Sequence, residues 1–115
     1  MADQCLFCRI VAGEIPAKIV AESERCVAFR DVNPQAPLHV LVVPRRHIAS
    51  LDAAGAADAE VLGELSLLAA RIARAEGVAA GGYRTVVNTN ADAGQTVFHV
   101  HLHLLAGRRL GWPPG

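Results

Sequence analysis

Residues 98–105 read FHVHLHLL, with histidines and large apolar residues in strict alternation. Successive side chains of a β-strand point to opposite faces, so this pattern predicts a half-buried strand over residues 97–105. His99, His101 and His103 would share one face at intervals of about 6.6–7 Å. Neither core packing nor a solvated strand face accounts well for three imidazoles in a row. The apolar residues of the segment would face the core: Phe98, Val100, Leu102 and Leu104.

Two kinds of chemistry use such a row of histidines. Three of them on a regular strand are too far apart to bind one metal ion together, because zinc needs each nitrogen at about 2.0–2.1 Å. One of them could still join ligands from elsewhere. A neutral imidazole can instead attack a phosphorus or carbonyl centre and form a labile adduct. His101 has an imidazole on each side and is the best candidate nucleophile. The preceding turn, residues 94–96, could hold a phosphate through its glycine and neutral donors, or be an ordinary hairpin turn.

The rest of the chain supplies four further β-rich runs and one amphipathic helix. Residues 58–76 place apolar side chains on one helical face, with Asp58 as N-cap, while Gly63 inside the helix indicates close packing. The apolar run in 38–43 predicts a central strand. We expect an α+β fold with the order β-β-β-α-β-β after a short N-terminal helix at 5–11, and an antiparallel sheet. The expected strands are 18–22, 26–32, 38–43, 83–88 and 97–105, with a polar turn at 89–96.

Length and composition limit the classes of function. A chain of 115 residues is enough for a single domain, which we expect to span 1–115. Eleven Lys and Arg balance eleven Asp and Glu, which argues against binding to nucleic acid or to an anionic membrane. No apolar run is long enough for a membrane span, and the N-terminus lacks the features of a signal peptide. We therefore expect a cytoplasmic protein.

The three cysteines do not suggest a disulfide framework, because their number is odd. Cys26 lies in an apolar run and is interpreted as a small buried residue. Cys5 and Cys8 form a C-x-x-C, for which a redox pair, half of a metal site and two incidental core cysteines are the alternatives. A redox pair is disfavoured because no strand precedes it. The choice between the other two depends on finding two more ligands.

These segments together resemble a known family. Residues 99–105 match the H-x-H-x-H-x-x motif of the histidine-triad (HIT) superfamily. Further segments resemble its nucleotide-binding HINT branch, in order and without large gaps: 5–11, 14–17, 29–32, 34–39, 43–48, 94–98 and 112–115. The resemblance implies a five-stranded antiparallel sheet with one long and one short helix, and a homodimer. It also implies binding of purine nucleoside monophosphates and hydrolysis of nucleoside phosphoramidates, with no organic cofactor.

The resemblance assigns roles to individual residues. His101 would attack the α-phosphorus, and water would then release AMP or GMP from the nucleotidyl-imidazole. His99 and His103 would steady the phosphate and the ring of His101, His39 would line the pocket, and Asp31 would hold the ribose hydroxyls. The residues expected around the purine are Leu6, Phe7, Ile10, Phe29 and Val32. Those expected near the phosphate are Asn88, Gly94, Gln95, Thr96 and Val97. From the residues alone, core packing for Ile10 and Phe29 and a turn role for Asp31 stay open.

A zinc site also follows from the resemblance. Some bacterial HINT-like proteins, and the related galactose-1-phosphate uridylyltransferases, bind zinc through a C-x-x-C and two histidines. Carried over, the ligands are Cys5, Cys8, His47 and His99, a closed set typical of structural zinc. The alternative is two buried thiols with His47 on the surface.

Two functions other than the phosphoramidase stay open. One is a dinucleoside polyphosphate hydrolase, and the other is a nucleotide-sensing interaction module whose turnover is incidental.

Overall fold

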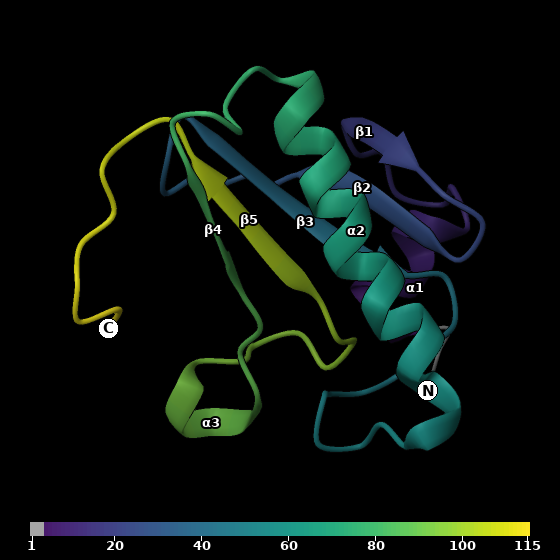
Figure 1. The fold of residues 1–115 in the computed structure, drawn as a ribbon. Helices are drawn as coiled ribbons and strands as arrows, with labels where there is room; N and C mark the ends of the chain where they lie inside the picture. The colour runs from purple at the N-terminus through teal and green to yellow at the C-terminus, as the bar shows by residue number, and fades with distance from the viewer. Residues whose placement is uncertain (1–3) are drawn as a thin grey trace.

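A five-stranded antiparallel sheet with the strand order β1-β2-β3-β5-β4 is the framework of the chain (Figure 1). The computed structural model describes residues 4–115. β3 lies in the centre and is buried along its whole length, as its apolar run predicts. The α+β class and the antiparallel sheet are confirmed. The strands are β1 (Ile19–Glu22), β2 (Cys26–Arg30), β3 (Leu38–Pro44), β4 (Tyr83–Val86) and β5 (Leu102–Ala106).

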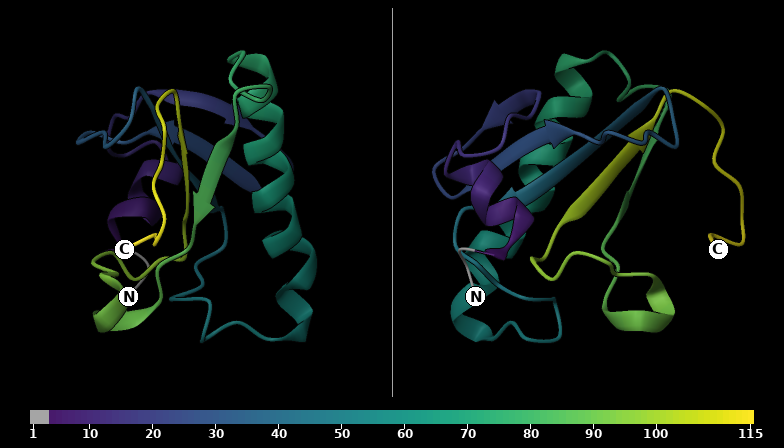
Figure 2. Two further views of the ribbon diagram at one scale, coloured as in Figure 1. Left: turned by 60° about the vertical axis from the view of Figure 1, so that its left-hand side comes forward. Right: turned by 180° about the vertical axis from the view of Figure 1, so that it is seen from behind.

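The two faces of the sheet carry different helices (Figure 2). The long helix α2 (Ala59–Ala75) crosses one face and packs its apolar stripe on β2, β3 and β5. The short helix α1 (Leu6–Val11) lies on the other face, where Phe7 packs on β2 and β3. The buried α2 side chains are Val61, Leu65, Leu68, Ala69, Ile72 and Ala73. On the α1 face, Phe7 belongs to an apolar cluster with Val27, Phe29, Leu41 and Val43.

Strand register places two histidines on the α1 face. His103 of β5 is the partner of Leu41 in β3, and Leu41 belongs to the apolar cluster under α1. Partners in an antiparallel pair point to the same face, and so do residues two apart on one strand. His103 and His39 therefore share the α1 face. The sheet thus brings together two histidines that are 64 positions apart in the chain.

The predicted strand over 97–105 is only half correct. β5 begins at Leu102, and residues 97–101 form an irregular approach to it. The Val100 N–H donates to the Ile48 carbonyl at 2.7 Å, so this approach pairs with a loop instead of a strand. His99 and Val100 are consecutive and both buried, whereas Phe98, expected in the core, is 50% exposed. Strict alternation in sequence therefore does not extend to strict alternation in space.

Other boundaries differ for local reasons. The polar stretch 89–96 contains a further short helix, α3 (Asn90–Ala93), which ends at Gly94 with a φ of 88°. β2 ends at Arg30 and β4 at Val86, two residues before the predicted ends in both cases. The close packing inferred at Gly63 is wrong, because this residue is exposed and a Cβ built there meets no atom within 4 Å.

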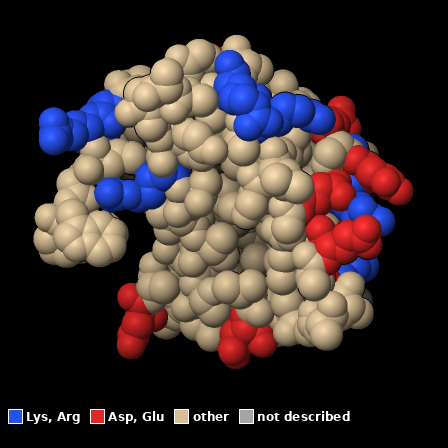
Figure 3. All heavy atoms as spheres, viewed as in Figure 1, with Lys and Arg blue, Asp and Glu red and all other residues tan. Residues whose placement is uncertain are grey.

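The start of α2 is as predicted in position but not in bonding. Asp58 is the residue before Ala59, and a short 3-10 turn, η2 (Ala56–Asp58), precedes the helix. The Asp58 carboxylate accepts hydrogen bonds from the Gly55 N–H at 2.9 Å and from the Arg46 guanidinium, and it makes no capping hydrogen bond to α2. Figure 3 shows that charged side chains lie around the margin of the α2 face, with basic ones at the top and acidic ones along the right-hand side and the bottom. Among the described helices, none has the length and apolar character needed to cross a membrane.

Candidate active site and metal centre

His101 is held with one ring nitrogen available for chemistry. The residue is 8% exposed. Its Nδ1 lies 2.8 Å from the main-chain carbonyl oxygen of His99. A carbonyl oxygen only accepts, so Nδ1 carries the proton and Nε2 carries the lone pair. The sheet does not make this bond, because His99 and His101 lie in the irregular segment before β5. The irregular backbone is what turns the His99 carbonyl toward the ring two residues later.

Phe7 supports the His101 ring from α1. The ring centroids of Phe7 and His101 are 5.0 Å apart, and the two planes are nearly perpendicular at 88°. Phe7 makes similar edge contacts with Phe29 at 5.4 Å and His99 at 6.0 Å. Such T-shaped pairs are favourable arrangements of aromatic rings. The position of the His101 ring therefore depends on how firmly α1 is held on the sheet.

His39 and His103 form a hydrogen-bonded pair next to His101. Nε2 of His39 lies 2.9 Å from Nδ1 of His103, and 3.4 Å from a carboxylate oxygen of Asp31. The rings of His103 and His101 are 5.0 Å apart. Burial lowers the pKa of His39, and Asp31 opposes that change. Burial, with the nearby His101 and His39, lowers the pKa of His103 to about 4. Both imidazoles are therefore neutral near pH 7.

Asp31, His39 and His103 offer three potential metal ligands, but their hydrogen bonding does not suit a metal. Their ligand atoms lie within 4.8 Å of one another. The Gln35 main-chain N–H donates to Nδ1 of His39 at 3.0 Å. A neutral imidazole bound to a metal through Nε2 would carry its proton on Nδ1, where the amide proton of Gln35 already lies. The cluster is therefore better described as a hydrogen-bonded group.

A second cluster has the donors and the spacing of a metal centre. The ligand atoms of Cys5, Cys8, His47 and His99 all lie within 4.8 Å of one another. Nδ1 of His99 is 3.4 Å from both sulfur atoms, and Nδ1 of His47 is 3.3 Å from the Cys8 sulfur. Tetrahedral zinc with ordinary bond lengths would separate sulfur from nitrogen by about 3.6 Å. The four residues can therefore hold a metal ion with little movement.

The outer contacts of this cluster favour metal binding. Nε2–H of His99 donates to the Pro44 carbonyl at 2.8 Å, which leaves the Nδ1 lone pair facing the two sulfur atoms. A main-chain carbonyl behind a ligating histidine is the usual outer partner in metal sites. Cys5 is the N-cap of α1, and its sulfur accepts from the Cys8 N–H at 3.4 Å. Cys26 takes no part: it is fully buried, and burial raises the pKa of its thiol to about 11.

The turn before the histidines is built around Gln95. This side chain is 5% exposed. Its amide oxygen accepts from the Asn90 N–H at 2.9 Å, and its amide nitrogen donates to the carbonyls of Ala49 at 2.9 Å and Val97 at 3.1 Å. Gln95 therefore ties the turn to a neighbouring loop and does not present its amide outward. Thr96 is exposed, Val97 packs beside the α1 cluster, and Asn88 is half-buried.

The residues expected around a purine fall into two groups. Phe7 and Phe29 are buried in contact with each other, and Ile10 packs against the same cluster. Leu6 is 45% exposed, and Val32, in the loop after β2, is fully exposed. The first group forms an apolar floor beside His101. The second group lies on α1 and on the β2–β3 loop with its side chains open to solvent.

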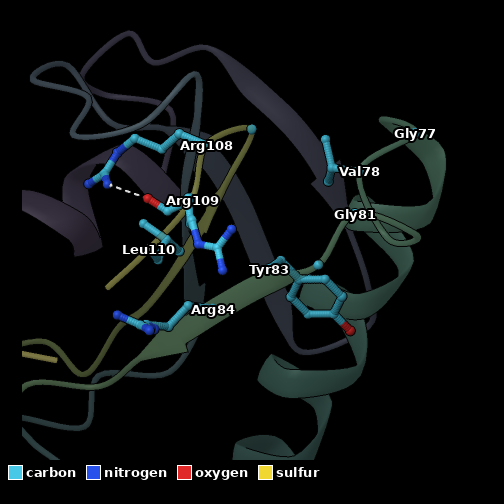
Figure 4. A pocket seen from close by; sticks show the side chains of 10 residues that line it. Gly77, Val78, Gly81, Tyr83, Arg84, Arg108, Arg109 and Leu110 are labelled. Carbon is cyan, nitrogen blue, oxygen red and sulfur yellow. Dashed lines mark hydrogen bonds between the residues drawn. The ribbon is translucent and has the colours of Figure 1, made fainter. Parts of the chain in front are cut away.

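The described part of the surface has hollows near both ends of β5. One, of about 440 Å³, lies beside the metal cluster, with Thr96, Leu6 and Phe98 among its lining residues. The other, of about 820 Å³, contains no histidine or cysteine. Figure 4 shows Arg84 on β4 and Arg109 on the segment after β5 lining this larger groove. The larger hollow is therefore separate from the histidine and cysteine clusters.

Comparison with known proteins agrees with this geometry. A model of the HIT domain family matches residues 12–110. The chain belongs to the HIT family. The matched region of this HIT protein contains all five histidines but begins after Cys5 and Cys8, so the cysteine pair lies outside it. The resemblance inferred from the sequence is confirmed.

Individual relatives of this HIT protein cover nearly its whole length. It is 44% identical to the purine nucleoside phosphoramidase of Escherichia coli K12 over 111 residues, which are 96% of this chain and 93% of that protein. The crystal structure of a HIT family hydrolase from Legionella pneumophila matches with a TM-score of 0.95 and 49% identity, over 97% of this chain and 100% of that one. A zinc-bound histidine triad family protein from Mycobacterium smegmatis matches with a TM-score of 0.83 and 32% identity, over 100% and 82% of the two chains.

Some groups in the site have no signal in the sequence of this HIT protein. The Gln35 N–H, the Pro44 carbonyl and the His99 carbonyl each bind a histidine ring, and all three belong to the main chain. Residue identity says nothing about where a main-chain group points. Only Pro34 and Pro37, on either side of Gln35, indicated that this loop has a restricted conformation.

Proposed function

We propose that this HIT protein is a purine nucleoside phosphoramidase that forms a covalent intermediate on His101. The observation that carries the proposal is the bond from Nδ1–H of His101 to the His99 carbonyl, which leaves Nε2 as the nucleophile. Likeness in sequence to the phosphoramidase of Escherichia coli supports the same class of reaction. A mostly buried imidazole with its lone pair directed by a main-chain bond is suited to attack at phosphorus.

The reaction has two displacement steps. In the first, Nε2 of His101 forms a bond to the α-phosphorus while the phosphorus–nitrogen bond of the substrate breaks, and the amine leaves with a proton taken from solvent. In the second, water attacks the same phosphorus, the bond to Nε2 breaks, AMP or GMP is released, and the proton lost by the water returns to solvent. His101 is regenerated as a neutral imidazole. Nδ1 keeps its proton throughout, so the positive charge of the intermediate lies against the His99 carbonyl oxygen.

The surrounding residues bind and orient the nucleotide. His103 and Thr96 supply donors to the phosphate, with Asn88, Gly94 and Val97 around them, while Gln95 holds the turn that carries Thr96. His99 and His39 steady the rings on either side. Asp31 accepts hydrogen bonds from the ribose hydroxyls, which a carboxylate can do for two at once. The purine lies against the apolar floor of Phe7, Phe29 and Ile10, with Leu6 and Val32 closing over it.

We further propose that Cys5, Cys8, His47 and His99 bind structural zinc. Two thiolates and two imidazoles at the observed separations fit tetrahedral zinc, and a zinc-bound relative has the same fold. When bound, the ion would fix α1 to the segment before β5. No ligand position would be left for a reacting water, because the set is closed. The role of these residues is therefore to hold Phe7 and His99 in place.

A homodimer is proposed through the free edge of β4. This strand is at the end of the sheet order, and its residues alternate between exposed and half-buried. An unpaired edge strand can add to a second sheet. Trp112, in the segment that follows β5, is 82% exposed, which is unusual for the largest apolar side chain. Sedimentation velocity would give a dimer mass, and a monomer at all concentrations would contradict the proposal.

The function is tested by hydrolysis of adenosine 5′-phosphoramidate by wild-type protein and His101→Asn. We expect AMP release by the wild type, loss of turnover by at least roughly 10³-fold in the variant, and AMP binding by both in calorimetry. Trapping and mass spectrometry should show an adenylyl adduct on wild-type protein only. Absence of turnover in wild-type protein that binds AMP would overturn the proposal. Dinucleoside polyphosphates would then be tested, followed by nucleotide-dependent capture of a protein partner.

A further inference from the structure

The Gln35 main-chain N–H is directed at the His39 ring. The donor nitrogen lies 3.0 Å from Nδ1 of His39, four residues further along the chain. A main-chain N–H can only donate a hydrogen bond. Nδ1 of His39 must therefore carry a lone pair and no proton. This conclusion holds for the neutral ring and needs no assumption about a bound ligand.

The tautomer of His39 determines that of His103. A neutral imidazole has one N–H, so the proton of His39 is on Nε2. That nitrogen lies 2.9 Å from Nδ1 of His103, closer than the 3.4 Å to Asp31. The Nε2–H of His39 therefore donates to His103, whose Nδ1 must accept. The remaining proton of His103 is then on its own Nε2.

A change of either ring to its other state is opposed. A proton on Nδ1 of His39 would point at the N–H of Gln35, and a proton on Nδ1 of His103 would point at the N–H of His39. Burial favours the neutral form of both rings, because charge is poorly solvated there. Three groups in a row, of which the first is fixed main chain, are thus held in a single hydrogen-bonded arrangement.

Gln35 itself is held on several sides. Its carbonyl accepts from Nε of Arg108 at 3.1 Å, and its side-chain amide donates to the Asn33 carbonyl at 3.0 Å. The loop is closed at its base by the Asp31 N–H, which donates to the His39 carbonyl at 3.0 Å. Arg108 comes from the segment after β5, whose last residue, Ala106, pairs with Leu38 at the start of β3, so segments next to both strands contribute to the position of this peptide group.

We propose that the Gln35 main-chain N–H is a positioning group that sets the tautomers of His39 and His103, so that His103 presents an Nε2–H donor to the substrate phosphate. The last clause rests on the proposed function, whereas the tautomers do not. A donor is what the developing negative charge on a phosphoryl oxygen requires, and the opposite tautomer of His103 would present a lone pair to it. Gln35 acts through two other residues and does not itself touch the reacting atoms.

The first test uses wild-type protein labelled with ¹⁵N, without nucleotide. Long-range ¹H–¹⁵N spectra distinguish protonated from unprotonated ring nitrogens, and N–N couplings across hydrogen bonds identify donor and acceptor. We expect Nε2-protonated His39 and His103, with couplings from Gln35 N to His39 Nδ1 and from His39 Nε2 to His103 Nδ1. A proton on Nδ1 of His39 would overturn the proposal. This measurement depends neither on a variant that folds nor on any turnover.

The second test compares Gln35→Pro, which deletes the N–H, with Gln35→Ala, which keeps it. We expect Gln35→Ala to keep the tautomers and the first coupling. In Gln35→Pro, the tautomers should become mixed and kcat should fall roughly 10- to 100-fold below that of Gln35→Ala, with similar affinity for AMP. Retention of both tautomers in Gln35→Pro, or equal kcat despite mixed tautomers, would overturn the proposal. Failure of the proposed function would look different: wild-type protein without turnover, but with the expected tautomers.

Discussion

His99 contacts His101, the proposed nucleophile, through its main chain and the cysteine pair through its side chain. Its carbonyl oxygen accepts from Nδ1–H of His101 at 2.8 Å, while its own Nδ1 lies 3.4 Å from the sulfur atoms of Cys5 and Cys8. Cys5 is also the N-cap of α1 and Cys8 lies in its first turn, and this helix carries Phe7 against the His101 ring. The proposed metal centre is therefore connected to His101 in two ways, through the residue that orients the proton of His101 and through the helix that packs on its ring.

Loss of one cysteine of the proposed metal centre should release the metal and loosen the candidate active site. Cys8 is the best position, because its sulfur lies near both His47 and His99. We expect Cys8→Ser to lose its zinc, measured by elemental analysis, and to unfold at a lower temperature. kcat should also fall, roughly 10- to 100-fold, because α1 and His99 would no longer orient the His101 ring, and loss of an orienting contact behind a reactive group has effects of this size.

Cys26 provides the matched control for this experiment. It is buried in the core under α2 and is not among the ligating group. Cys26→Ala should lower stability through lost packing but keep the metal. Equal metal content in wild type and Cys8→Ser would contradict the proposed centre. Equal metal loss in both variants would mean that metal binding reports only on general stability.

The alternation of residues 98–105 predicted the correct sheet but only part of the correct strand. It placed Leu102 and Leu104 in the core and His103 on the opposite face, as found. It also placed Val100 in the core, as found, but the strand itself does not extend before Leu102, because the Val100 N–H bonds to the Ile48 carbonyl instead of to a strand. The alternation of polar and apolar residues indicates only which side chains face water. It gives no information about the hydrogen bond to the loop at Ile48, which takes the place of strand pairing.

The sequence predicted side chains of the candidate site but none of its main-chain groups. The spacing of Cys5 and Cys8 left half of a metal site as one of three alternatives, and the remaining ligands, His47 and His99, came from the family resemblance and not from spacing. The carbonyls of His99 and Pro44 could not have been found, because every residue has a carbonyl. Gln95 is the opposite case: a polar side chain expected to face a ligand is used to bind three main-chain groups.

A stabilising substitution is expected at Gly63. The residue lies inside α2, is exposed, and has open space where a Cβ would be. Glycine inside a helix is less favourable than alanine by about 1 kcal/mol, mainly because it has more freedom to lose on folding. Gly63→Ala should raise the free energy of unfolding in urea by roughly 0.5–1 kcal/mol. No change, or a loss, would mean that α2 meets a neighbour at this position in solution, for instance a second copy of the chain.

Gly107 should respond to alanine in the opposite direction. Its φ is 95°, and a Cβ built there lies 2.8 Å from Cβ of Pro37. Both the backbone conformation and the contact disfavour a side chain, so Gly107→Ala should lower the free energy of unfolding by roughly 1–3 kcal/mol. Gly111→Ala is the control, since its Cβ position is open and its φ is not positive. Equal free energies of unfolding for the two variants would contradict this prediction and would mean that the loop at Pro37 moves away from the new Cβ at no measurable cost.

Glu64 should make stability depend on pH in acid. The Ser23 hydroxyl and the Arg25 N–H both donate to its Oε2, at 2.6 and 2.8 Å, and these bonds lower the pKa of the carboxyl from 4.5 to about 2. The unfolded chain therefore takes up a proton at higher pH than the folded chain. This stabilisation is complete above pH 4.5, and it is lost as the pH falls toward 2.

The variant Glu64→Gln isolates this contribution from that of other carboxyl groups. Urea unfolding of wild type and variant between pH 2 and 7 should show a difference in free energy that is constant above about pH 5 and shrinks below it. Glu60→Gln is the matched control on the same helix, because Glu60 is 78% exposed and contacts Arg25 at 3.5 Å. A difference that stays constant down to pH 2 would show that the Glu64 carboxylate does not hold the β1–β2 hairpin on α2. A similar slope in Glu60→Gln would assign the effect to the net charge of α2 instead of to the bonds with Ser23 and Arg25.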